Sequence, residues 1–239
     1  MYEEIIDKIK EYQVIMAEVS LKLSKGLKLY SKNLIPYEEK LKNSGWTMGM
    51  NLAPYHVVEI GEKISAGQVD EYFYNLYMSY DCEEFNRMIE EIRRNLESRL
   101  IKAFDECVYA FEHQKYVICI NTLIPILEGI ISEFFYDKNN IMMKKVCRVQ
   151  LERSNNNEFN LDRIAWSINL NFIERLYLKS EFDKDEPLNI NRHWLLHGRS
   201  SYDINIIDCL KIINAIDTFS CLLEFQKDHY NMVESEKGQ

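Results

Sequence analysis

The segment NRHWLLHG at residues 191–198 holds the densest group of side chains that could do chemistry. A helix turns about 100° per residue, which places His193 and His197 about 100° and 140° from Arg192 and Trp194 on the other side. One sector is therefore cationic and titratable, because imidazoles exchange protons near neutral pH and a guanidinium keeps its charge. An element that packs through its apolar face would hold the three polar side chains toward a cleft or a partner chain.

Two other interpretations of this cluster stay open. His193 and His197 have the spacing of an HxxxH metal pair. The sequence offers no HExxH motif and no acidic third ligand at a suitable spacing, so no metal or other cofactor is expected. Arg192 and the histidines could also serve structure alone, by hydrogen-bonding carbonyls or carboxylates across the fold.

Glu128 is a second chemically unusual residue, because it lies beside Leu127 and Ile131 on an apolar stripe. A carboxylate in such a place needs a partner. We expect Glu128 either to bond the 191–198 segment, at Arg192 or a histidine, or to reach solvent at the edge of the stripe.

The elements that must position these residues are helices. Apolar residues at spacings of three and four predict one long amphipathic helix over 81–111 and a second over 116–136, which Pro125 must kink or begin. A third helix is predicted to follow a cap at Asn160. The 191–198 segment ends at Gly198, a typical helix C-terminus.

The last helix is predicted to begin at a cap on Asp203. The sequence contains no convincing strand pattern, glycine-rich phosphate loop or internal repeat. The expected fold is therefore an all-α, up-and-down helical bundle.

The chain divides into an N-terminal helical region over 1–80 and a helical domain over 81–230, followed by a tail at 231–239 that we expect to be disordered. A half-exposed helix is predicted over 2–31. The stretch 43–67 collects four of the eight glycines and marks the internal boundary.

Composition excludes several classes of protein. The 29 basic and 38 acidic residues give a net charge of −9, which argues against a protein that coats nucleic acid with its whole surface. The longest run without Asp, Glu, Lys or Arg is 43–58, with 16 residues, too few to span a membrane. No secretory signal is apparent and the six cysteines form no CxxC pair, so we expect a cytoplasmic protein with reduced thiols. A local basic patch lies over 138–153, which is either a phosphate-binding surface or a solvated helix face.

Arg192, the polar His193 directly after it, three further residues and then His197 resemble the R-x4-6-H motif of the HEPN superfamily. The stretch 103–135 resembles the paired long helices of bacterial HEPN proteins. The motif-bearing segment and the apolar helix after it resemble the closing part of that fold. The similarity covers about residues 81–226, and its specificity comes from the position of the motif between the third helix and the closing helix.

The resemblance implies a four-helix bundle and a metal-independent endoribonuclease that leaves 2′,3′-cyclic phosphate ends, acting in phage defence or a toxin-antitoxin-like response. His197 would be the general acid or base, Arg192 would stabilise charge on the phosphorane, and His193 would position the phosphate. The expected substrate-binding residues are Asn191, Arg199, Lys144, Lys145 and Arg148.

The expected partners are RNA, a second copy of the chain in a homodimer with a composite cleft, and an antitoxin or regulatory protein. One alternative is a catalytically silent HEPN module that binds nucleotide or a protein through the same groove. Another is an interaction protein that binds through its N-terminal 80 residues.

Overall fold

The computed structural model describes residues 35–49, 54–135, 142–154, 161–179, 181–187 and 189–237. Every regular element within these residues is a helix, in agreement with the predicted all-α bundle. The helix predicted over 2–31 and the cap predicted at Asn160 lie outside the described residues. In chain order the elements are η1 (Ile35–Tyr37), α2 (Glu38–Ser44), α3 (Pro54–Ser65), α4 (Val69–Met78), η2 (Tyr80–Cys82), α5 (Glu83–Asn95), α6 (Ser98–Glu112), α7 (Tyr116–Ser132), α8 (Met143–Ser154), α9 (Leu161–Leu176), α10 (Arg192–Leu196) and α11 (Ile206–Lys237).

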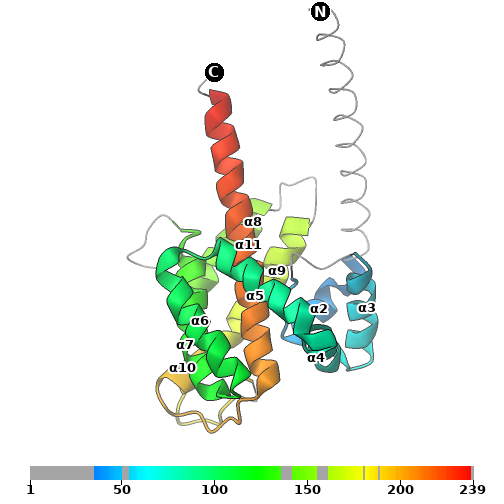
Figure 1. Ribbon diagram of the computed structural model, residues 1–239, viewed down its shortest axis with the longest axis vertical. Coiled ribbons are helices and arrows are strands. Elements are labelled where there is room, and N and C mark those ends of the chain that lie inside the picture. The colour runs from blue at the N-terminus through cyan, green and yellow to red at the C-terminus, as the bar shows by residue number, and fades with distance from the viewer. Residues whose placement is uncertain are drawn as a thin grey trace, which may run out of the picture.

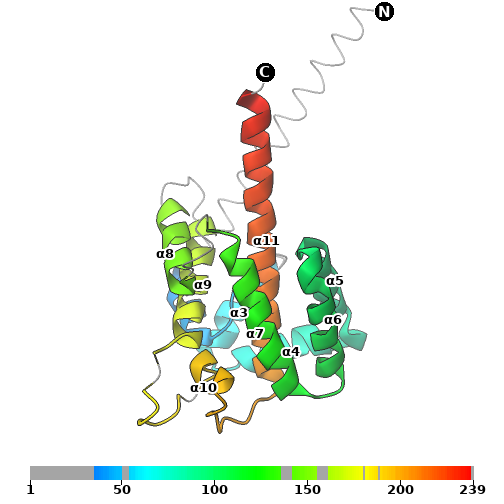
Figure 2. The ribbon, with the colours of Figure 1, turned by 90° about the vertical axis from the view of Figure 1, so that its left-hand side faces the viewer.

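Helices α7 and α11 form the centre of the bundle, and a pair of helices lies on each side of them (Figures 1 and 2). The two run parallel, because the Cys209 thiol near the start of α11 donates to the Tyr116 carbonyl at the start of α7, 3.6 Å away. Pro125 lies inside α7 and so does not begin it. The predicted apolar stripe of α7 is buried, with Ile120, Leu123, Ile124, Leu127, Ile130 and Ile131 in the core.

Helices α5 and α6 form a hairpin on one side of this centre, where the sequence predicts a single helix over 81–111. The chain leaves the helical conformation at Leu96 and Glu97, whose ψ angles are 142° and 140°. It then reverses, so that Phe85 of α5 stacks on Phe111 of α6 with ring centroids 4.9 Å apart. The single-helix prediction is wrong because both helices bury an apolar face in the same core, which continues the apolar spacing across the turn.

Helices α8 and α9 form the pair on the other side of the centre (Figure 2). They are antiparallel, because Arg148 in the first half of α8 pairs with Glu174 near the end of α9. Trp166 of α9 contacts Phe134 at the end of the α7 segment, with ring centroids 5.1 Å apart, and thus joins the pair to the core. Helix α8 is formed by the segment that the sequence indicates only as a basic patch.

The core continues across residue 80 into the N-terminal region. Trp46 is 1% exposed and stacks on Phe73 of α4, with ring centroids 4.1 Å apart. The amide of Asn214 in α11 donates to the carbonyl and hydroxyl of Thr47, at 2.9 and 2.8 Å. Tyr77 donates in turn to Asn214 at 2.6 Å. Helices α2, α3 and α4 are therefore part of the same packed body as the rest of the described chain.

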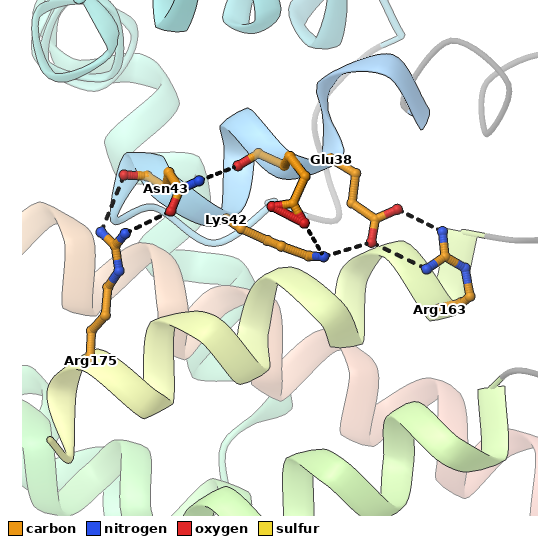
Figure 3. Close-up of polar contacts among 6 residues, drawn as sticks. Glu38, Lys42, Asn43, Arg163 and Arg175 are labelled. Atoms are coloured by element: carbon orange, nitrogen blue, oxygen red, sulfur yellow. Dashed lines mark hydrogen bonds and ion pairs between the residues drawn. The ribbon is translucent and has the colours of Figure 1, made fainter.

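Helix α2 lies along α9 and is held to it by polar contacts at both ends (Figure 3). Arg163 donates to both carboxylate oxygens of Glu38, at 3.2 and 2.6 Å. Burial acts to raise the pKa of Glu38, but these hydrogen bonds hold it below its usual value. At the other end Arg175 donates to the carbonyl and side-chain oxygens of Asn43, at 3.2 and 3.0 Å.

Helix α11 begins with a capping box that differs from the predicted cap at Asp203. The Asn205 side chain accepts from the Ile207 N–H at 2.9 Å, and Asp208 accepts from the Asn205 N–H at 3.0 Å. The helix continues to Lys237 and so covers most of the segment 231–239, for which the sequence predicts a disordered tail. Among the described helices, none combines the length and apolar content needed to cross a bilayer.

The six cysteines are free thiols, and five of them are buried. Burial raises the pKa of Cys107 and of Cys147 to about 12. The thiols thus serve as core residues, as predicted.

Candidate functional site

The short helix α10 carries the predicted motif and is fixed at both of its ends. Asn191 is 3% exposed, and its side-chain oxygen accepts from the N–H groups of His193 and Trp194, at 2.9 and 3.3 Å. Its amide donates to the Leu178 carbonyl beyond the end of α9, at 3.0 Å. Gly198 ends the helix with a φ of +63°, a left-handed conformation that glycine adopts without strain. Asn191 therefore holds the motif in place, and its role as a substrate contact stays a prediction.

Glu128 of α7 anchors Arg192. The Arg192 Nε donates to Glu128 Oε1 at 3.0 Å, and the hydroxyl of Tyr177 donates to the same oxygen at 2.6 Å. The Arg192 guanidinium also lies over the Tyr177 ring, 5.9 Å from its centroid. Within the described residues, the two terminal nitrogens of Arg192 have no hydrogen-bond partner. The prediction that Glu128 bonds the motif segment is confirmed.

The two histidines lie side by side along α10. Their rings are nearly parallel, at 5°, with centroids 6.4 Å apart. His193 is half-buried and His197 is exposed at the C-terminal end of the helix. Burial lowers the pKa of His193, and the nearby charges of Arg192, His197 and Lys144 lower it further. His193 is therefore held in its neutral form at neutral pH.

The 181–187 loop packs against α10 through Phe182. The Phe182 ring lies 5.4 Å from the Trp194 ring and 5.7 Å from the His197 ring, measured between centroids. The guanidinium of Arg199 also lies over the Phe182 ring, 4.2 Å from its centroid. Arg199 is exposed, as expected for a residue that meets a ligand.

Glu186 ties this loop to the chain after α10. Its carboxylate accepts from the hydroxyl of Ser200 and from both the N–H and the hydroxyl of Ser201, the last two at 2.7 Å. Although desolvation acts to raise the pKa of Glu186, these hydrogen bonds lower it. The loop is thereby fixed against the site.

The predicted cations of α8 differ in their distance from the motif and in their partners. Lys144 is near enough to His193 to lower its pKa. Lys145 is exposed and lies over the Phe135 ring, 5.6 Å from its centroid. Arg148 is exposed and paired with Glu174. Lys138, at the start of the basic patch, lies outside the described residues.

Sequence reasoning missed two residues of this site, Tyr177 and Phe182. Tyr177 lies just past the end of α9, where its burial and its hydrogen bond to Glu128 raise its pKa. Phe182 stands in the segment EFDKDEP, where five of the seven residues are charged. An aromatic residue among charged loop residues is the signal that could have found it.

No group of three or more histidine, cysteine or acidic side chains that could hold a metal ion is present in the described part of the chain. Comparisons of the sequence with protein-family models and with curated proteins, and of the structure with solved structures, give no match.

Proposed function

We propose that this protein is a metal-independent endoribonuclease of the HEPN type. The observation that carries the proposal is the grouping of Arg192, His193 and His197 on one fixed helix, with Glu128 holding the guanidinium by its Nε. A permanent cation whose terminal nitrogens have no partner among the described residues, beside two imidazoles, is suited to phosphodiester chemistry.

In the proposed reaction the 2′-hydroxyl oxygen of the RNA attacks its own phosphorus and the bond from phosphorus to the 5′-oxygen breaks. His197 takes the proton of the 2′-hydroxyl, and the leaving 5′-oxygen receives a proton from solvent water. The products are a 2′,3′-cyclic phosphate and a 5′-hydroxyl. DNA is not a substrate, because it has no 2′-hydroxyl.

Arg192 stabilises the negative charge that develops on the phosphorane. His193 stays neutral because of its lowered pKa, so it donates a hydrogen bond to a phosphate oxygen without competing for the transferred proton. Lys144 and Lys145 contact the RNA backbone, whereas Arg148 must give up its pairing with Glu174 to do so.

The proposed active form is a homodimer in the cytoplasm. His197 and Arg199 are exposed, so the site of one copy is open on this side. A second copy of the chain facing the first would cover the site and complete a composite cleft. The proposed biological setting is phage defence or a toxin-antitoxin-like response, with an antitoxin or regulatory partner. Light scattering that gives the mass of a monomer at every working concentration would contradict the composite cleft.

The experiment that tests the activity compares wild-type protein with Arg192→Ala and His197→Ala on end-labelled mixed RNAs in excess EDTA. Two matched controls are available. Arg94→Ala removes an exposed arginine that pairs with Glu91 on α5, and His113→Ala removes an exposed histidine at the end of α6. We expect cleavage by wild type and by both controls only.

A catalytically silent module that binds nucleotide or a protein partner is the second candidate. The ion pair of Arg192 with Glu128 favours this candidate, because Glu128 neutralises part of the positive charge that the guanidinium would offer to a phosphorane. The same assay separates the two candidates, because a silent module leaves every RNA intact while all five proteins remain folded.

A further inference from the structure

An aromatic and cationic surface lies next to the proposed catalytic residues. Phe182 remains 36% exposed, and the central carbon of the Arg199 guanidinium lies over its ring, 4.2 Å from the centroid. Trp194 and His197 contact the ring at steep angles, 73° and 75°. Phe182 thus supports the guanidinium of Arg199, a residue that is itself exposed.

This surface is held in place before any ligand arrives. The loop that carries Phe182 is fixed through Glu186 to Ser200 and Ser201. Arg199 is fixed at its backbone, where its N–H donates to the Trp194 carbonyl at 2.9 Å. A long side chain that is already ordered loses less conformational freedom when it binds a ligand.

The chemistry of the pair favours a flat, electron-rich ligand. A guanidinium stacked on an aromatic ring offers a planar cation to whatever packs on its other face. Unpaired nucleobases are recognised by stacking on aromatic side chains and arginine planes. The His197 ring, 5.7 Å from Phe182, places the proposed proton transfer directly beside such a base.

We infer that Arg199, supported by Phe182, forms a stacking platform for one unpaired nucleobase next to the scissile phosphate. The substrate class is therefore single-stranded nucleic acid, since a paired base has no free face to offer. This assignment gives Arg199 a role in base stacking in place of the expected backbone contact. It rests on the proposed function only for the identity of the neighbouring phosphate.

The test uses a fluorescein-labelled single-stranded oligodeoxynucleotide, which a 2′-hydroxyl-dependent nuclease cannot cut. Fluorescence anisotropy gives its affinity for the full chain as wild type, Phe182→Ala, Phe182→Tyr, Arg199→Lys and the control Phe225→Ala. Phe225 is an exposed phenylalanine of α11, 58% accessible. An abasic oligomer of the same length reports the backbone contribution alone.

Loss of one stacked base lowers affinity by about 5- to 150-fold. We expect a loss of this size for Phe182→Ala and for Arg199→Lys, which keeps the charge but not the plane. Phe182→Tyr and Phe225→Ala should bind like wild type. The abasic oligomer should bind all five proteins alike, with the same dependence on salt.

Failure of this inference and failure of the proposed function give different results. Binding that depends on Phe182, with no cleavage of RNA by wild type, keeps the platform and removes the nuclease. Cleavage of RNA with unchanged affinity in Phe182→Ala and Arg199→Lys overturns the platform and keeps the nuclease. An Arg199→Lys protein that binds like wild type shows a backbone contact, and no oligonucleotide binding by wild type also overturns the inference.

Discussion

Asp217 of α11 is a buried carboxyl whose removal has a calculable effect on stability. It is 3% exposed, and its Oδ1 has no hydrogen-bond partner among the described residues. Burial, with a smaller contribution from the charge of Glu91, raises its pKa from 3.8 to about 7 against the opposing charge of Arg87. The carboxyl is thus protonated in the folded protein below neutral pH.

The magnitude follows from the difference between the folded and unfolded pKa values. A raise from 3.8 to about 7 corresponds to about 4 kcal/mol, at roughly 1.4 kcal/mol per pKa unit. Because the folded state binds the proton more tightly, this stabilisation is fully present below pH 3.8 and is lost as the pH rises to about 7. Asp217→Asn is neutral at every pH and carries no such loss.

We therefore expect Asp217→Asn to be more stable than wild type at pH 8 by up to about 4 kcal/mol, with the difference shrinking toward zero near pH 4. Urea unfolding at several pH values between these limits measures it. Asp183→Asn, a change at an exposed aspartate of the 181–187 loop, serves as the control and should show no such trend. A stability difference between Asp217→Asn and wild type that does not vary with pH would refute the reasoning.

Three further predictions concern the candidate site. Asn191→Ala should cost about 1–3 kcal/mol of unfolding free energy in urea, because it removes the cap of α10 and the hydrogen bond to the Leu178 carbonyl; an unchanged stability would contradict the positioning role. Tyr177→Phe should cost only about 1 kcal/mol, since Glu128 keeps its bond to the motif arginine, and a loss above about 3 kcal/mol by the same measurement would show that the hydroxyl does more. Lys144→Ala should raise the pKa of His193, which NMR titration of the imidazole follows, because the lysine charge lowers it; a fall in that pKa would contradict the placement of the lysine.

The all-α architecture could be predicted because apolar residues recur at helical spacing in the segments that form the core. The stripe of α7 and the stop at Gly198 were both readable from residue types and spacing. The turn at Leu96 and Glu97 was not, because no glycine or proline marks it and the apolar spacing continues through it. The cap of α11 was also hard to predict. Asp203 and Asn205 both lie near the start of the helix and both are residue types that can cap it, and in the structure Asn205 does so.

The motif residues of the candidate site could be found in the sequence, because they are close together along the chain. Glu128 is detectable as a carboxylate that needs a partner on an apolar stripe, but its pairing with Arg192, and not with a histidine or solvent, is known only from the structure. Tyr177 and Phe182 could not be assigned, because their roles depend on where the ends of α9 and of the following loop lie in space. The capping role of Asn191 could not be separated from a ligand contact in the sequence, because both use the same amide group.

The most direct test of the proposed chemistry is the identity of the product ends. Wild-type protein is incubated with RNA in excess EDTA, and the fragments are analysed by mass spectrometry. The account predicts 2′,3′-cyclic phosphate and 5′-hydroxyl ends, and no product when RNA carrying 2′-O-methyl groups is used. Fragments with 5′-phosphate and 3′-hydroxyl ends, or no cleavage by a folded and dimeric protein, would contradict it.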